Sequence, residues 1–322
     1  MATVKDSIPH IVRTSADQRQ RDMFRATIGR IEQVNSKIRL LRLYLDNDQS
    51  PLRHLPGQYV DLHVPEVERV GGFTITSPPQ TAIKLPAPTP STTTPPSAAT
   101  FDDPYIELAI QKALDNPPAA YLWQQPDQIM NAPVRFRIGG NFTFPPMTLS
   151  MPEFQQINNV VLIAGGVGIN PIMSMVTAMD MLGAKRMGGL PSRLRILYTS
   201  RRGLDGKGKL EEILFEERLK AIAAKRASKQ DNVDFGYTFF ETFKDDVPAN
   251  IEQDTTSMPL NMKTCRRRIK PEDLAEAVGS EKQRQTTLVY VCGLPDMTDD
   301  FVQLLKAMPG LDEKRVLCEK WW

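Results

Sequence analysis

A glycine-rich turn between a buried strand and a helix is the strongest candidate for chemistry in this sequence. The apolar run 160–164 leads directly into Gly165, Gly166, Val167, Gly168, Ile169, Asn170 and Pro171. Glycines let a backbone approach a pyrophosphate closely, and a helix N-terminus offers free N–H groups and the positive end of a dipole. Asn170 is placed to cap the helix and Pro171 to begin it. The spacing is not G-x-G-x-x-G, so we interpret the turn as a phosphate site of another kind, a ligand-free tight turn being the alternative.

A second turn has the same design. The strand ending at Cys292 is followed by Gly293 and by Pro295, which begins a helix. Ligands of an open parallel sheet lie at the carboxyl ends of its strands, so both turns are expected at one edge. Taken alone, Cys292 is best interpreted as a small buried apolar residue.

Two further segments carry candidate polar groups. In the run Gly71–Ser77, alternation places Phe73, Ile75 and Ser77 on one strand face and Thr74 and Thr76 on the other. The residues alone favour an ordinary barrel strand.

Ser200 and Arg201 end another predicted strand, where a hydroxyl beside a guanidinium could hold a phosphate monoester. A solvated strand end explains that pair equally well.

The elements that position these groups fall into two classes. Of the 26 prolines, 17 lie between Pro51 and Pro146, which favours short strands and turns there. Six strands predict an antiparallel β-barrel or sandwich, at residues 24–34, 38–45, 58–64, 72–77, 105–112 and 134–138. After about residue 158, strands at 159–164, 194–199, 233–240, 287–292 and 315–318 alternate with helices at 171–182, 209–225, 271–278 and 295–307. This alternation predicts a parallel α/β domain covered on both faces.

The predicted organisation is therefore a tail, a barrel and an α/β domain. The tail spans residues 1–22, the barrel domain 23–152 with a disordered insert at about 82–100, and the α/β domain 153–322 with a polar insert at about 241–270. We interpret Arg266, Arg267 and Arg268 at the end of that insert as a solvated loop.

Composition excludes several classes of protein. The sequence has 40 Lys and Arg against 38 Asp and Glu, a net charge of +2. This balance lacks the excess of basic residues that is typical of proteins that bind nucleic acid or anionic membranes. No apolar run approaches the roughly 20 residues of a membrane span. Three cysteines are too few for a four-cysteine zinc or iron–sulfur site, so redox chemistry would use an organic cofactor. Acidic residues near the N-terminus disfavour a mitochondrial presequence, and we expect the cytoplasm rather than the mitochondrial matrix.

These motifs arrive in the order seen in the ferredoxin-NADP reductase superfamily. From about Phe24 to Trp322 the sequence resembles it, and segments 116–119, 134–144, 165–171 and 319–322 look closest to the members named for an oxidoreductase NAD-binding domain. The resemblance implies a flavin-binding barrel for FAD, followed by a domain for NADPH or NADH.

The flavin side of the resemblance is incomplete. In the family motif Arg-x-Tyr-Ser/Thr, Phe73 takes the aromatic place and Thr74 the hydroxyl that meets flavin N5, but Gly71 stands where the arginine would be. Arg69 is the hypothesised substitute. Pro118 and Ala119 replace the second pyrophosphate element. The flavin-contacting stretch implied by the resemblance comprises Gly72, Phe73, Thr74, Ile75, Thr76 and Ser77.

The nicotinamide side matches better. The residues of the turn from Gly165 to Pro171 fall on the family's nucleotide turn, and Cys292, Gly293 and Met297 fall on the turn whose cysteine approaches nicotinamide C4. Ser200 and Arg201 resemble the pair that reads an adenosine 2′-phosphate, which favours NADPH. Glu319 and Trp322 resemble the acidic residue and the aromatic cover near the flavin.

The resemblance implies an NAD(P)H oxidoreductase in which a hydride passes from nicotinamide C4 to FAD and electrons leave to an external acceptor, with Thr74 and Cys292 at the reacting atoms. Two alternatives stay open. One is a module that binds or senses NAD(P)H without turnover, and the other is a flavin reductase that releases FAD or FMN.

Overall fold

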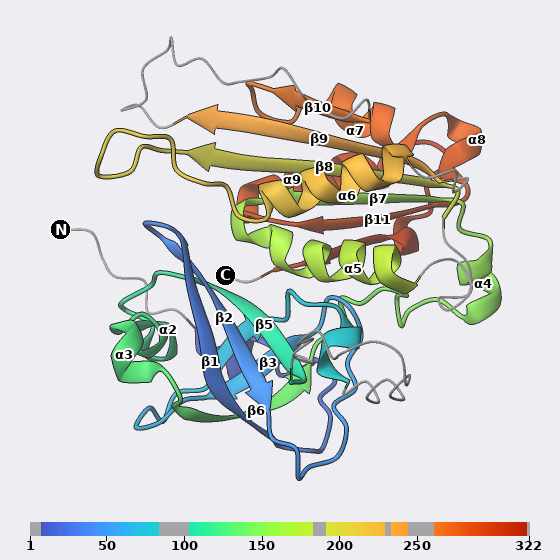
Figure 1. The fold of residues 1–322 in the computed structure, drawn as a ribbon. Helices are drawn as coiled ribbons and strands as arrows, with labels where there is room; N and C mark the ends of the chain where they lie inside the picture. The colour runs from blue at the N-terminus through green and yellow to red at the C-terminus, as the bar shows by residue number, and fades with distance from the viewer. Residues whose placement is uncertain (1–7, 84–102, 183–190, 229–232, 244–260, 321–322) are drawn as a thin grey trace, which may run out of the picture.

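The computed structural model describes residues 8–83, 103–182, 191–228, 233–243 and 261–320. Within these residues each half of the chain forms its own sheet (Figure 1). The proline-rich insert, the middle of the polar insert and Trp322 lie outside the described residues.

The first sheet is antiparallel and closes on itself. Its strand order is β4-β3-β6-β1-β2-β5, with β1 Phe24–Asn35, β2 Ile38–Leu45, β3 Tyr59–His63, β4 Gly71–Thr74, β5 Tyr105–Gln111 and β6 Pro133–Gly139. Just after β4 the chain meets β5: Ile75 bridges Leu108, and the Thr76 N–H donates to the Glu107 carbonyl at 2.8 Å. The two ends of the strand order therefore join, and the predicted barrel is confirmed.

Alternation along the barrel strands separates core from surface. Val60 and Leu62 point into the barrel core, where Ile75 and Leu108 also lie fully buried. Their neighbours on β3, such as Asp61, therefore face outward. Short helices lie beside the barrel strands and before β7: α1 His10–Arg13, α2 Pro117–Leu122, α3 Pro126–Ile129 and α4 Met151–Gln155.

The second sheet is parallel and has helices on both faces, as predicted. Its order is β10-β9-β8-β7-β11-β12, with β7 Asn159–Gly165, β8 Arg193–Arg202, β9 Asp234–Phe243, β10 Met262–Cys265, β11 Thr287–Cys292 and β12 Val316–Glu319. The helices are α5 Ile169–Leu182, α6 Glu216–Ser228, α7 Pro271–Val278, α8 Glu281–Arg284 and α9 Pro295–Lys306.

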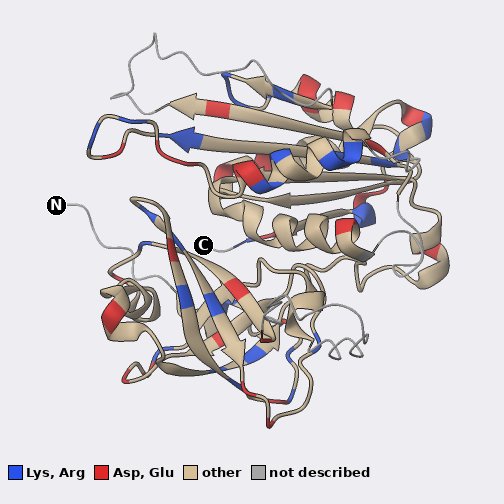
Figure 2. Cartoon of the chain, in the orientation of Figure 1, with Lys and Arg blue, Asp and Glu red and all other residues tan. Residues whose placement is uncertain are grey.

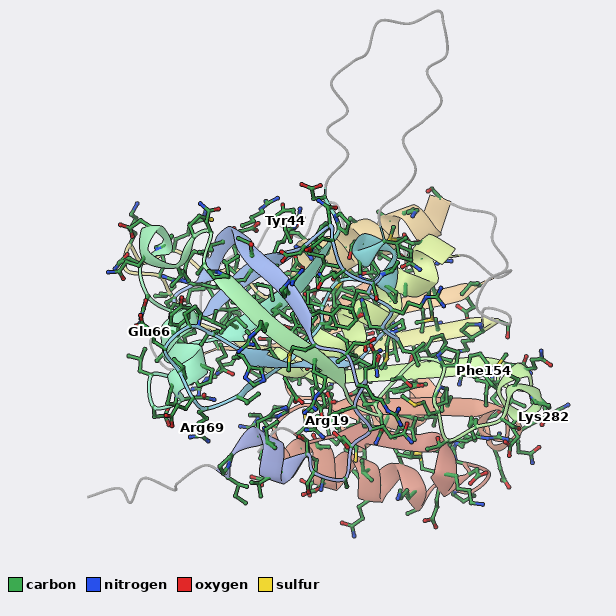
Figure 3. The ribbon with its side chains drawn as sticks, turned by 90° about the horizontal axis from the view of Figure 1, so that it is seen from below. Arg19, Tyr44, Glu66, Arg69, Phe154 and Lys282 are labelled. Atoms are coloured by element: carbon green, nitrogen blue, oxygen red, sulfur yellow. The ribbon has the colours of Figure 1, made fainter. Side chains whose placement is uncertain are left out.

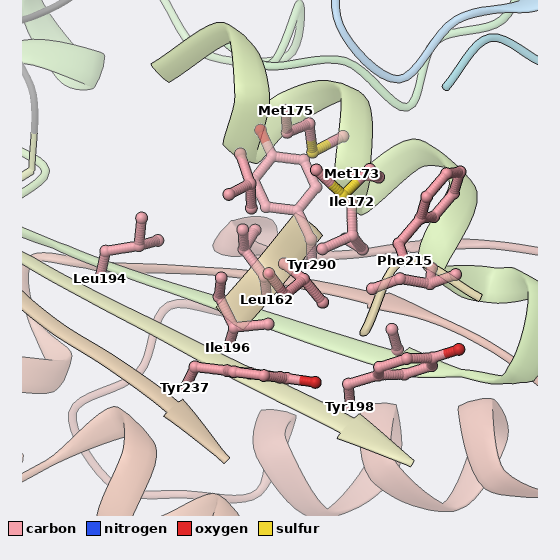
Figure 4. Close-up of a cluster of buried hydrophobic side chains, with 14 of the residues drawn as sticks. Leu162, Ile172, Met173, Met175, Leu194, Ile196, Tyr198, Phe215, Tyr237 and Tyr290 are labelled. Atoms are coloured by element: carbon pink, nitrogen blue, oxygen red, sulfur yellow. The ribbon is translucent and has the colours of Figure 1, made fainter. Parts of the chain in front are cut away.

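Two apolar clusters, one on each sheet face, hold the helices in place. Side chains of α5 such as Ile172 and Met175 pack with Leu162 and Ile196 of the sheet (Figure 4). The same cluster includes Phe142 and Phe144 from the segment after β6, so it continues into the interface with the barrel domain. The opposite face packs against α7 and α9.

Several sequence expectations need correction. Helix α5 begins at Ile169, directly after a 3-10 turn at Gly166–Gly168, so Asn170 lies inside the helix and does not cap it. Helix α6 begins at Glu216, seven residues after the predicted start at Lys209. Strand β10 forms a sheet edge inside the predicted polar insert, because Met262 and its neighbours pair with β9.

No described helix is long and apolar enough to cross a lipid bilayer. Nor do the described residues contain a group of three or more His, Cys, Asp or Glu placed to hold a metal ion.

Candidate functional site

The two glycine turns pack against each other at the carboxyl edge of the parallel sheet. A Cβ on Gly168 would collide with the Cys292 carbonyl oxygen and lie 2.7 Å from the nitrogen of Gly293. The Met297 side chain lies against both Gly165 and Gly293. Glycine at 165 and 168 is therefore explained by close packing of the turns themselves.

Gly166 differs from its neighbours. Its φ is +55°, and no atom lies within 4 Å of a Cβ built on it. Positive φ is unfavourable for residues with a Cβ, and the open space above Gly166 lets a ligand approach the backbone. Gly166 is thus the position in the turn best suited to phosphate or nicotinamide.

Cys292 is buried rather than presented to solvent. It is 1% exposed and belongs to the same apolar cluster as Tyr290. Burial raises the pKa of the Cys292 thiol well above its usual range, and the nearby Glu319 carboxylate acts in the same direction. Burial therefore disfavours the thiolate, which is the form that a nucleophilic cysteine needs. Glu319 is its register partner on β12, so these two residues share the edge.

The barrel strand β4 presents its two faces differently. Thr74 is 6% exposed and pairs in register with Tyr59 on the outer face, whereas Phe73 packs against the barrel core and is only partly buried. A Cβ at Gly71 would lie 2.5 Å from the Phe73 ring and 2.7 Å from the Pro118 side chain. The space in which a residue-71 arginine would begin is thus filled.

Helix α2 is a poor anion site at its N-terminus. Pro117 and Pro118 occupy its first two positions and carry no N–H, which leaves Ala119 as the donor of the first turn. A pyrophosphate at this turn would find neither the hydroxyl nor most of the amides on which such sites depend.

The N-terminal segment packs on the outer face of β3 and β4. The His10 imidazole lies against Gly72, and its Nε2 is 2.9 Å from Oδ1 of the fully buried Asp61. Arg19 and Arg137 donate to the other oxygen at 2.7 and 3.1 Å. Residues 1–22 were predicted to be a tail, and this cluster was not predicted because its members are far apart in the chain and match no motif.

Arg13 of helix α1 lies within electrostatic range of Arg69 on the barrel and of Glu319 on β12. Burial lowers the pKa of Arg13, the nearby Arg69 lowers it further, and the Glu319 carboxylate acts against both. In Figure 3, Arg19 and Arg69 both lie near α1. Arg69, the hypothesised flavin-phosphate ligand, therefore lies within electrostatic range of Arg13.

The remaining barrel candidates have structural partners. Ile75 is fully buried in the barrel core. The Thr76 hydroxyl donates to Oε1 of Glu107 at 3.1 Å, and the Ser77 hydroxyl accepts from the Glu107 N–H at 3.0 Å. Asn170, predicted on the nucleotide turn, donates from Nδ2 to the Ala109 carbonyl at 3.3 Å.

The end of β8 extends past the nucleotide turn and is rich in positive charge (Figure 2). Arg201 is exposed and donates from Nε to the Phe243 carbonyl at 3.2 Å. Arg202 is buried between Glu241 and Glu216, and its pKa is raised because these two carboxylates outweigh its burial. Arg202 thus anchors the strand end on which Ser200 and Arg201 lie. In the segment 266–268, which we interpreted as a solvated loop, Arg267 donates two hydrogen bonds to the Asp273 carboxylate.

Comparison with known proteins agrees with this geometry. Residues 162–303 match the oxidoreductase NAD-binding domain. The chain is 30% identical to the Danio rerio protein called oxidoreductase NAD-binding domain-containing protein 1. The alignment covers 97% of this chain and 97% of the Danio rerio protein.

Two solved structures share the fold. One is the ferredoxin NADP+ reductase from Neisseria gonorrhoeae with bound FAD and NADP, with a TM-score of 0.54, 14% identity, and coverage of 93% of this chain and 99% of that one. The other is the NAD+ form of the CS-b5R domains of human Ncb5or, with a TM-score of 0.58, 17% identity, and coverage of 92% and 69%. The chain therefore belongs to the family of oxidoreductase NAD-binding domain-containing protein 1 and has the two-domain fold of ferredoxin-NADP reductases.

Proposed function

We propose that this protein is an NAD(P)H-dependent flavin reductase, which takes NAD(P)H at the carboxyl edge of the parallel sheet and passes a hydride to a flavin that exchanges with solution. The observation that carries the proposal is a hydrogen bond between the helix that follows the glycine turn and the barrel segment that follows Thr74. Helix α5 starts at the nucleotide turn, and its Ser174 hydroxyl donates to the carbonyl of Ser77, three residues after Thr74 on the barrel.

The nucleotide half of the proposal rests on the turns described above. Gly166 leaves open backbone for the nicotinamide nucleotide, and Arg201 stands at the neighbouring strand end, where a 2′-phosphate would meet an exposed guanidinium. We therefore propose NADPH as the preferred donor. Cys292, buried and protonated, would shape the floor beneath nicotinamide C4 without taking part in proton transfer.

The barrel residues that would contact a flavin favour a flavin that exchanges with solution over a tightly bound FAD. The Neisseria relative is described with bound FAD, but the residues of this chain do not fit the pyrophosphate of a resident FAD. The start of α2 lacks two N–H groups, and the side chains of Phe73 and Pro118 close the space at Gly71. Phe73 and Thr74 remain to meet the flavin ring, and we propose Arg69 as a cation that meets a flavin phosphate.

In the proposed reaction the C4–H bond of NAD(P)H breaks with both of its electrons, and an N–H bond forms at flavin N5. The flavin then takes one proton from water, so the products are NAD(P)+ and a dihydroflavin. The protein contributes alignment of the two rings and exclusion of water. The dihydroflavin carries its two electrons to an external acceptor.

Anaerobic titration of the purified full-length protein tests the proposal. We expect little flavin absorbance in the protein as isolated, and bleaching of added FAD or FMN by NADPH at a rate proportional to protein. A protein that is yellow as isolated and bleaches with NADPH alone would instead establish tightly bound FAD.

A second candidate is NAD(P)H binding without turnover. It is favoured by the packing of His10 on Gly72, which covers part of the outer face of β4. Saturable NADPH binding together with failure to reduce any added flavin would select this candidate and refute the reductase.

A further inference from the structure

One face of helix α5 is hydrogen-bonded to the barrel at two points one helical turn apart. Asn170 Nδ2 donates to the Ala109 carbonyl on β5 at 3.3 Å, and Ser174 Oγ donates to the Ser77 carbonyl at 2.9 Å. Ser174 is fully buried and Ser77 is 4% exposed. The bond between them therefore has no water to replace it if the serine hydroxyl is removed.

The barrel end of this bond is itself held firmly. The Ser77 hydroxyl accepts from the Glu107 N–H, and the Glu107 carboxylate accepts from Thr76. Helix α6 reaches the same carboxylate: Arg218 donates to its two oxygens at 2.6 and 3.0 Å. Glu107 is 3% exposed, so both domains meet at a buried carboxylate beside Ser77.

A third contact links the strand that ends at Cys292, and so the second glycine turn, to the barrel domain. The hydroxyl of Tyr290, two residues before Cys292, donates to the Thr143 carbonyl at 2.7 Å. The elements that carry Gly166 and Cys292 are thus each bonded to the barrel domain. Because the interface holds several such bonds, we expect the two domains to stay docked when any one hydroxyl is removed.

We propose that Ser174 is a positioning residue for hydride transfer, one whose bond to Ser77 sets how closely the nucleotide turn approaches Thr74. This inference rests on the proposed reductase function. Ser77 lies three residues after Thr74, and Ser174 lies eight residues after Gly166, so the bond links the segment that follows Thr74 to the helix that follows Gly166. Hydride transfer needs the reacting atoms about 3–3.5 Å apart, and a misplacement of about 1 Å lowers the rate about 100-fold.

The test compares Ser174→Ala with Thr177→Ala, which removes a hydroxyl from the same helix at a partly exposed position. Stopped-flow absorbance of FMN bleaching by NADPH and by NADPH deuterated at C4 gives the hydride-transfer rate and its isotope effect. Calorimetry gives the NADPH Kd, and a thermal melt gives Tm. For Ser174→Ala we expect a rate lowered about 10- to 100-fold with a larger isotope effect, an NADPH Kd within about twofold of wild type, and Thr177→Ala like wild type.

A second variant guards against a folding defect. Arg218→Lys keeps the charge beside Glu107 but loses the bidentate geometry, and we expect the same pattern with a smaller rate loss. If Ser174→Ala transfers hydride at the wild-type rate, or loses rate and NADPH affinity in parallel, the positioning role is wrong while the reductase function stands. If the wild type reduces no flavin, the reductase function fails and the positioning role fails with it.

Discussion

Replacing Asp61 by asparagine should release the N-terminal segment from the barrel. The fully buried Asp61 carboxylate accepts hydrogen bonds from His10, Arg19 and Arg137. Asparagine has the same shape but no charge, and its NH₂ group would face donors. The guanidinium of Arg19, 13% exposed, would lose its counter-ion without gaining much water.

The magnitude follows from burial. Removing one partner of a buried ion pair costs about 3–5 kcal/mol. Arg137 is 35% exposed in this cluster and can recover some hydration, so we expect Asp61→Asn to lower the free energy of unfolding by about 2–4 kcal/mol. At about 3 °C per kcal/mol for a chain of this size, Tm falls by about 6–12 °C.

The assay pairs thermal and urea unfolding with limited trypsin digestion at Arg13 and Arg19. Asp48→Asn is the matched control, because Asp48 is 75% exposed and its pair with Arg25 lies at the surface. We expect the control to lose little stability, because an ion pair between two exposed side chains contributes little to folding. A loss for Asp61→Asn as small as that of the control, with no faster cleavage at Arg13, would refute the reasoning.

The pH dependence gives an independent check. Burial would raise the pKa of Asp61, but the bonds from His10, Arg19 and Arg137 lower it from 3.8 to about 2. A depressed carboxyl pKa stabilises the fold above the unfolded value, and this stabilisation is lost as the pH falls through the folded value. Wild-type stability should therefore drop between about pH 4 and pH 2, and Asp61→Asn should show a shallower drop in the same acid titration.

Three further outcomes follow from the site. Arg201→Ala should raise the Kd of NADPH at least about tenfold and leave the Kd of NADH within about twofold, as measured by calorimetry, since a charge-assisted hydrogen bond contributes about 1.5–3 kcal/mol; equal losses would contradict a 2′-phosphate contact. Gly168→Ala should lower the free energy of unfolding in urea by about 3 kcal/mol, because its Cβ would meet the Cys292 carbonyl. Gly166→Ala should lower it less, by about 1 kcal/mol from its positive φ, and an equal or larger loss for Gly166→Ala would contradict the close packing of the two turns at Gly168. Maleimide should modify the exposed Cys318 of the native protein and leave the buried Cys292 unmodified until urea unfolds it, as followed by peptide mass spectrometry; rapid native labelling of Cys292 would contradict its burial.

Much of the fold was predictable because its signals are local. Six barrel strands and the β-α alternation follow from side-chain periodicity and turn residues, and strands β2 and β11 begin and end at the predicted residues. Helices α7 and α9 also begin at the predicted Pro271 and Pro295, whereas the predicted starts of α5 and α6 were wrong. Asn170 was expected to cap α5, but the 3-10 turn before it continues into the helix, and its amide bonds to β5 instead.

The candidate site also has a part that the sequence predicted and a part that it did not. The two glycine turns are contiguous in sequence, and the rule that parallel strands end at one edge predicts that they meet. The role of each glycine was not predictable, since Gly168 meets the Cys292 carbonyl and Gly166 meets open space only after the turns dock.

The sequence by itself predicted a barrel followed by a parallel α/β domain and a glycine turn at residues 165–171, and the family resemblance pointed to Gly71 in the place of an arginine. Only the tertiary structure decided that residues 8–20 cover the barrel through Asp61, and that Ser77 and Ser174 join the domains. The physical reason is distance along the chain. Local backbone preferences and periodicity leave a pattern within a few residues, whereas a buried carboxylate and its cations come together only when remote segments are desolvated in the same place.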